Sequence, residues 1–189
     1  MKNIVFFLEE KSAKVFLEII VNRLKTKYDN YDTNFYFITF EGKSDLLKKY
    51  IKKIKHWNLP NSNFLIFIDE DNNKCIDLKN KIKNELQSNN LGNTIIRIAC
   101  KELESFYLGD LKAVESVYNV NNLARHQNKK LYRQPDFYPD PKGRLIKLTD
   151  NNYQEVDGSR KIADYINLDL NINKSSSYNC LLKSIIKYI

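Results

Sequence analysis

Short apolar runs alternate with longer amphipathic stretches over the first hundred residues of the chain. Four runs rich in β-branched and aromatic residues are typical of buried strands, at 3–8, 34–40, 64–68 and 94–100. Apolar residues at helical spacing predict helices over 12–27, 44–57 and 73–87, the first of them capped by Ser12. Strands that alternate with helices of this length indicate an α/β fold with a mainly parallel sheet of about four strands and helices on both faces.

The second half of the sequence is less regular. Short helices are expected over 102–108, 112–118 and 159–166, and an amphipathic helix over 175–189. The polar, proline-containing stretch 119–158 predicts a long loop. We expect a single domain in which residues 1–118 form the α/β core, while a basic loop and C-terminal helices, 119–189, pack on it.

Composition narrows the class of protein. No apolar run approaches the ~20 residues of a membrane-spanning helix, and no signal peptide is recognisable, so a cytoplasmic protein that does not engage membranes is expected. The three cysteines, Cys75, Cys100 and Cys180, are widely spaced and odd in number. This pattern fits reduced thiols better than a disulfide framework or a zinc site.

Positive charge is concentrated in one segment. Lysine and arginine outnumber aspartate and glutamate 31 to 23, which gives a net charge of +8. Residues 125–147, called the basic segment below, interleave Tyr132, Phe137 and Tyr138 with cationic side chains. Cations for phosphates and aromatic rings for base stacking suit single-stranded nucleic acid. The alternative is a solvated loop whose aromatic side chains dock on the core.

Acidic residues follow three of the four predicted strands. Glu9 ends the first run, Asp69 and Asp71 end the third, and Glu102 and Glu104 come shortly after the fourth. The carboxyl ends of parallel strands share one edge of the sheet, where ligands bind in such folds. Carboxylates gathered there repel one another unless a cation joins them, and Mg²⁺ or Mn²⁺ takes oxygen ligands.

A family resemblance rests on segments spread over nearly the whole chain. They are FLEEKSAKVFLE (7–18), FEGKSDLL (40–47), FLIFIDEDNNKCIDLK (64–79), RIACKELESFYLGD (97–110), GSRKIADYI (158–166) and SSSYNCLL (175–182). An apolar strand ending in glutamate, followed later by one ending in Asp-x-Asp, resembles the TOPRIM domain of topoisomerases, primases and overcoming-lysogenization-defect nucleases. The segments most closely resemble a small bacterial family of that superfamily, the domain-of-unknown-function family numbered 4276.

The resemblance implies roles for individual residues. Glu9 would lie near the scissile phosphate, and Asp69 and Asp71 would bind Mg²⁺. Glu102 and Glu104 would complete a second metal site, the alternative being that they are carboxylates at the surface or the N-terminus of a helix. The catalytic set would be Glu9, Asp69, Asp71 and Glu104. Glu10 stands where topoisomerases and primases usually have glycine, which leaves open whether the site cuts, joins or only binds. The candidate nucleic-acid ligands are Lys43, Arg97, Lys101, Arg125, Lys129, Lys130, Arg133, Arg144 and Arg160.

Three functional hypotheses follow. The first is a metal-dependent nuclease acting on DNA or RNA in bacterial defence against phage. Because the chain has no GxxxxGK[ST] loop, an ATPase of the ABC, structural-maintenance or AAA type would be a separate polypeptide. The second is a non-catalytic TOPRIM-fold subunit that binds nucleic acid or the ATPase, and a homo-oligomer is compatible with both. The third, a small-molecule phosphotransfer enzyme, fits the acids but not the basic segment.

Overall fold

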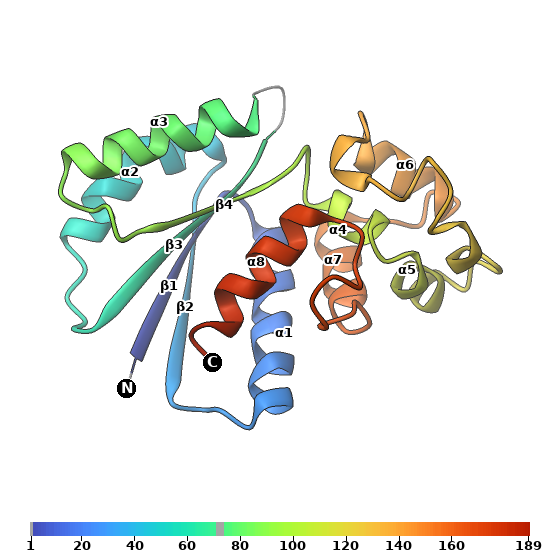
Figure 1. Ribbon diagram of the computed structural model, residues 1–189, viewed down its shortest axis with the longest axis horizontal. Helices are drawn as coiled ribbons and strands as arrows, with labels where there is room; N and C mark the ends of the chain where they lie inside the picture. Colours follow the sequence, from blue (N-terminus) through green and yellow to red (C-terminus); the bar gives the residue numbers. More distant parts are fainter. Residues whose placement is uncertain (1, 71–73) are drawn as a thin grey trace.

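The centre of the protein is a four-stranded, all-parallel β-sheet. The computed structural model describes residues 2–70 and 74–189. Within them the strands are β1 (Lys2–Leu8), β2 (Thr33–Thr39), β3 (Ser62–Asp69) and β4 (Ile95–Ala99), in the order β2-β1-β3-β4 (Figure 1). The predicted parallel α/β fold is therefore confirmed, and each predicted strand lies within two residues of its observed position.

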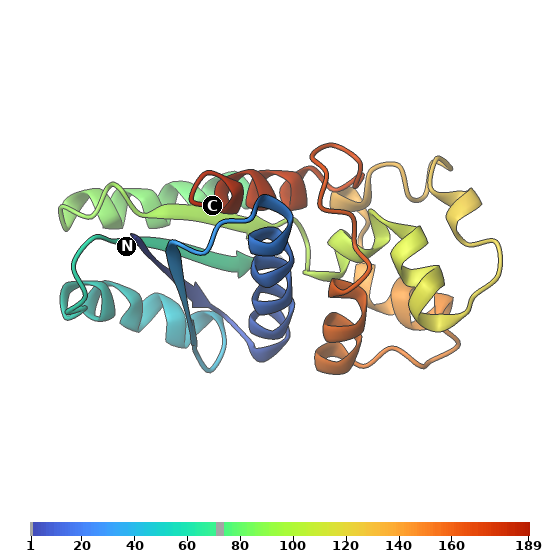
Figure 2. The same ribbon diagram turned by 90° about the horizontal axis from the view of Figure 1, so that it is seen from below.

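Helices cover both faces of this sheet. Helices α2 (Lys43–Lys55) and α3 (Cys75–Ser88) lie on one face, and α1 (Lys11–Tyr28) and α8 (Ser176–Ile186) lie on the other (Figures 1 and 2). Alternate side chains of a strand point to opposite faces. Phe6 of β1 accordingly packs with the α1 and α8 side, whereas Phe7 packs with α2 and α3.

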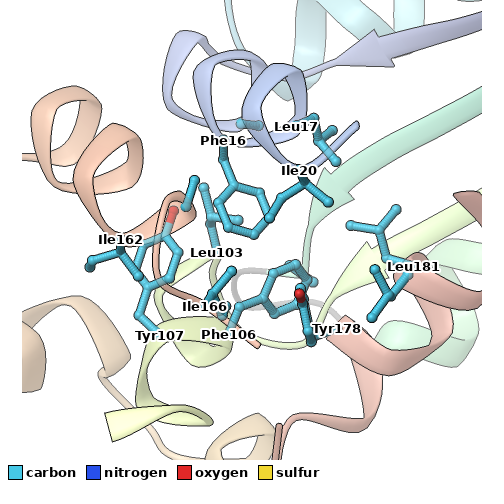
Figure 3. Packing of buried hydrophobic residues seen from close by; sticks show 14 of the residues in the cluster. Phe16, Leu17, Ile20, Leu103, Phe106, Tyr107, Ile162, Ile166, Tyr178 and Leu181 are labelled. Atoms are coloured by element: carbon cyan, nitrogen blue, oxygen red, sulfur yellow. The ribbon is translucent and has the colours of Figure 1, made fainter. Parts of the chain in front are cut away.

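A helical part extends beyond the carboxyl ends of the strands (Figure 1). It consists of α4 (Glu104–Leu108), α5 (Leu111–Tyr118), α6 (Pro141–Leu148), α7 (Glu155–Ala163) and the 3₁₀ turns η1 (Ala124–His126) and η2 (Pro135–Phe137). One apolar cluster joins it to the sheet (Figure 3). In that cluster the ring of Phe106 lies 6.1 Å from that of Phe16 on α1 and 5.3 Å from that of Tyr178 on α8. The burial of these large side chains fixes the helical part against the strand ends.

Two local predictions were wrong. Residues 119–158 contain α6 and the start of α7 rather than one continuous loop. Helix α6 begins at Pro141 because Asp140 caps it, accepting a bond from Gly143 N at 2.9 Å, and proline suits the first helical position. The N-cap of α1 is Glu10 rather than Ser12, whose hydroxyl donates instead to Glu10 Oε1.

In the described part of the chain, no helix is both long and apolar enough to cross a membrane.

Candidate functional site

The strand order places a topological switch between β1 and β3. From β1 the chain continues to β2 at one edge of the sheet, and from β3 it continues to β4 at the other. Ligands in open parallel sheets bind at the carboxyl ends of strands next to such a switch. Glu9 follows β1 directly, and Asp69 is the last residue of β3. The fold therefore brings these two predicted residues to the position where this architecture usually holds a ligand.

Glu9 is tied to the end of β3. Its Oε2 accepts a hydrogen bond from the backbone N–H of Asp69 at 3.2 Å. Its backbone oxygen accepts from Gly42 N at 3.2 Å, just before α2. Gly42 has φ +89°, a conformation that favours glycine. The end of β3 thus holds the Glu9 carboxylate, and the residue before α2 holds the Glu9 backbone.

Asp69 lies among several other acids. Burial of its carboxyl group raises its pKa well above the ordinary value, and the negative charges of Glu10, Glu104 and Glu9 raise it further. A single hydrogen bond from the backbone N–H of Leu103, at 3.4 Å, acts in the opposite direction. The carboxyl group of Asp69 therefore lies close enough to those of Glu9, Glu10 and Glu104 for their charges to raise its pKa.

Glu104 approaches this group from the helical part. It is the first residue of α4 and only 6% exposed. Burial raises its pKa to about 7, and the charges of Glu102 and Glu10 also raise it, while a hydrogen bond from Tyr153 lowers it. In that bond the Tyr153 hydroxyl donates to Glu104 Oε1 at 2.8 Å. Glu104 therefore exchanges its proton near neutral pH.

The remaining predicted metal ligands are placed differently. Oε2 of Glu102 accepts from the backbone N–H of Lys142 at the start of α6, at 3.1 Å. Asp71 lies outside the described residues. Over 2–70 and 74–189, no three histidine, cysteine, aspartate or glutamate side chains are arranged so that they are able to hold a metal ion. By donor type, Glu9, Asp69 and Glu104 still suit Mg²⁺, because they are oxygen donors and a divalent cation relieves the repulsion that Glu9 and Glu104 exert on Asp69.

The predicted phosphate ligands are dispersed over the surface. Lys43 begins α2, and Arg160 is exposed on α7. Arg97 on β4 is held against α8, where its Nε donates to Ser184 Oγ at 2.7 Å. Lys101 has φ +67°, and its Nζ lies 3.9 Å from Glu70 Oε2. Lys101 therefore forms an ion pair beside the acidic residues.

The basic segment divides into two kinds of residue. Its cations Arg125, Lys129, Lys130 and Arg133 are exposed. Tyr132 is only 1% exposed, and the Arg144 guanidinium lies 5.4 Å from its ring centre and donates to its hydroxyl. Tyr138 also packs against the core. For these two tyrosines docking on the core is the correct alternative, whereas Phe137 is 79% exposed.

Sequence reasoning missed three residues that shape the site. Tyr153, the partner of Glu104, is 49 positions away in the chain, and no local pattern indicates such a contact. Glu70 accepts bonds from Cys75 N at 2.8 Å and Lys101 N at 2.9 Å, which ties the start of α3 to the end of β4. Asp136 is buried and accepts from Ser177 N at 2.8 Å at the start of α8. The acidic Asp69-Glu70 pair was visible in the sequence, but the structural role of Glu70 was not.

Comparison with known proteins gives one positive finding. A family model described as a domain of unknown function (DUF4276) matches residues 8–186, which is nearly the whole chain. Neither the curated proteins nor the solved structures gave a match.

Proposed function

The chain belongs to the DUF4276 family, and on the basis of its site we propose that it is a Mg²⁺-dependent nuclease of TOPRIM type. One observation carries the proposal. At the switch point, burial raises the pKa values of Asp69 at the end of β3 and Glu104 after β4, and the charges of neighbouring carboxylates raise them further. Such an arrangement is costly to the fold, and perturbed acids of this kind concentrate at functional sites.

The proposed site assigns a task to each acidic residue. Glu9, Asp69 and Asp71 would hold the ion, with Glu102 and Glu104 as ligands of a second one. Mg²⁺ or Mn²⁺ supplies Lewis-acid polarisation of a phosphodiester. With a pKa of about 7 in the metal-free protein, Glu104 would lose its proton on binding the ion at neutral pH, and the hydroxyl of Tyr153 fixes its orientation.

Nucleic acid is the substrate class that fits the rest of the chain. The net charge of +8 and the exposed cations of the basic segment favour a polyanion. Lys43, Arg97, Lys101 and Arg160, with the cations of the basic segment, are the proposed phosphate ligands. We place the activity in the cytoplasm, in defence against phage and with an ATPase of the ABC, structural-maintenance or AAA type as a separate partner.

The test is a cleavage assay with purified protein. Single- and double-stranded DNA and RNA are incubated with Mg²⁺ or Mn²⁺, with and without the candidate ATPase. Cleavage by the wild type should disappear in Glu9→Gln and in Asp69→Asn combined with Asp71→Asn. These replacements keep the shape of each side chain, and Asn at 69 resembles the protonated Asp69 that burial favours.

A matched control is Glu18→Gln on the exposed surface of α1, where the carboxylate pairs with Lys14 at 3.8 Å. This variant should cleave like the wild type. The Asp69→Asn/Asp71→Asn protein should be folded, as judged by a melting temperature close to that of the wild type. Undiminished cleavage by this folded variant would exclude the proposed site.

A second function is favoured by Glu10, which stands where topoisomerases and primases usually have glycine. Its carboxylate accepts a hydrogen bond from the Ser12 hydroxyl. The chain would then be a non-catalytic TOPRIM-fold subunit that binds nucleic acid or the ATPase. It predicts salt-sensitive nucleic-acid binding without cleavage under every metal and partner condition. The variant Glu10→Gly tests this second function. If the wild type does not cleave and Glu10→Gly does, Glu10 is the reason that the natural chain is non-catalytic.

A further inference from the structure

A pocket opens between α3, the edge strand β4 and α8, with Phe137 of η2 among its lining residues. Its volume is about 580 Å³. Small-molecule sites usually have volumes of ~300–1,000 Å³. Glu70, which follows the candidate metal ligand Asp69 in the chain, forms part of its wall. The pocket therefore adjoins the acidic site without being part of it.

The walls of the pocket are largely apolar and rich in sulfur. All three cysteines of the chain, Cys75, Cys100 and Cys180, line it together with Ile96 and Ile98. Burial raises the pKa of Cys75 and raises that of Cys100 to about 12. At neutral pH these two are therefore uncharged thiols that act as small apolar surfaces.

The charged groups at this pocket favour an anion. Lys79, Arg97 and Lys101 line it, together with the acids Glu70 and Asp136. Both acids are engaged within the protein. Glu70 accepts from two backbone N–H groups, as described above, and Asp136 accepts from Ser175 Oγ at 2.6 Å and from Ser177. Lys79 is exposed, and Lys101 Nζ lies 3.9 Å from Glu70 Oε2. With Arg97, these cations outnumber the two acids, so the pocket favours a ligand of negative charge.

Phe137 gives this surface an aromatic platform. Its side chain is 79% exposed, although the preceding residue, Asp136, is buried and bonded to the start of α8. Asp136 therefore holds the backbone at this point, and Phe137 lies at the wall of the pocket. Exposed aromatic rings beside cations are the usual means of binding the bases of single-stranded nucleic acid.

The same pocket exposes the edge of β4, which raises the alternative of a peptide or a second copy pairing with this strand. Two backbone groups along this edge, one in β4 and one just after it, are already bonded within the protein. Arg97 Nη1 donates to Ile96 O at 2.8 Å, and Cys100 N donates to Ser177 Oγ at 3.3 Å. An added strand would have to displace these bonds, so strand addition is disfavoured.

We propose that this pocket binds one nucleotide of a single-stranded nucleic acid, with the base against Phe137 and the thiol-lined wall and the phosphate toward Lys79 and Lys101. The inference rests on the proposed function, because it supplies that function with a strand-holding site beside Asp69. If the pocket is occupied in this way, the nucleic acid next to the scissile bond must be unpaired when it binds.

The cysteines provide a direct assay. Because every cysteine of the chain lines the pocket, alkylation by a maleimide, followed site by site by mass spectrometry, reports on its occupancy. A short oligothymidylate is added in EDTA, so that no metal-dependent cleavage occurs. At a concentration about tenfold above Kd, the rate of Cys180 alkylation should fall about tenfold, because only the free protein reacts.

Two pairs of variants localise the effect. Phe137→Ala should raise the oligothymidylate concentration needed for half-maximal protection by about 5- to 150-fold, because it removes one stacking ring. Tyr165→Ala, which removes an exposed ring elsewhere, should leave protection unchanged. Lys79→Ala should weaken protection and reduce its dependence on salt, whereas Lys81→Ala, also exposed on α3 but outside the pocket, should have a smaller effect.

The outcomes separate this inference from the proposed function. Absence of protection, or protection that Phe137→Ala leaves intact, overturns the nucleotide pocket even if Mg²⁺-dependent cleavage is observed. Protection that grows with protein concentration and needs no oligothymidylate assigns the surface to a second copy and also overturns it. Protection by oligothymidylate with the predicted variant effects supports the pocket, even where no metal or ATPase elicits cleavage.

Discussion

Replacing Glu104 with glutamine removes a buried negative charge while keeping the shape of the side chain and an acceptor for the Tyr153 hydroxyl. The pKa of Glu104 is raised from 4.5 to about 7, so the folded protein favours the protonated acid. Below pH 4.5 this group therefore does not destabilise the fold. The free energy of unfolding decreases as the pH rises from 4.5 through 7, because the buried group loses its proton. Above pH 7 the buried carboxylate costs about 3 kcal/mol of unfolding free energy, because each pH unit between the two values corresponds to ~1.4 kcal/mol.

We therefore expect Glu104→Gln to be more stable than the wild type by about 3 kcal/mol at pH 8 in EDTA, and to differ little from it at pH 4.5. For a chain of 189 residues this corresponds to a melting temperature higher by roughly 6 to 12 °C. The assay is thermal unfolding followed by circular dichroism across this pH range. Glu18→Gln on the surface should change stability by less than ~0.5 kcal/mol at either pH.

Divalent cations extend the same experiment to the proposed site. Mg²⁺ compensates the buried charge, so it should stabilise the wild type at pH 8 more than it stabilises Glu104→Gln. The reasoning fails if Glu104→Gln is no more stable than the wild type at pH 8. It fails equally if the stability of the wild type is constant between pH 5 and pH 8.

Three further changes test the structure around the site. Gly158→Ala should destabilise the protein by about 1–3 kcal/mol in urea unfolding, because a Cβ there would lie 2.3 Å from a ring carbon of Tyr153; equal loss in Gly92→Ala, where the nearest atom is 3.8 Å away, would remove this explanation. Asp136→Ala should cost about 1–3 kcal/mol by leaving buried donors at the start of α8 unpaired, and a stability unchanged from wild type would contradict that role. Replacing the four exposed cations of residues 125–133 with alanine should weaken oligonucleotide binding and reduce the dependence of its affinity on salt concentration. An unchanged slope of log affinity against log salt concentration would refute this role.

The sheet and its acidic edge were predictable because the signals are local. An apolar run such as 64–68 that stops at Asp69 records both a buried strand and the polar residue at its end. Helix α6 was equally local, since Asp140 followed by Pro141 marks a helix start, but the surrounding polar sequence favoured a loop. The contact between Tyr153 and Glu104 was beyond prediction, because it depends on how α4 and the segment before α7 pack after the chain has folded.

The same distinction explains why the acids after β1, Glu9 and Glu10, lie beside Asp69. Parallel strands bring every carboxyl end to one edge, so their sequence positions alone favour no particular pair. The order β2-β1-β3-β4 makes β1 and β3 neighbours, and their connections leave toward opposite edges of the sheet, so neither connection covers the junction. The acids after β4 have no such junction with β1, because β3 lies between them. Glu104 therefore reaches the group only through the turn into α4, and it depends on Tyr153, a residue of the helical part, for its orientation. On this view the helical part completes the acidic site rather than merely covering the sheet.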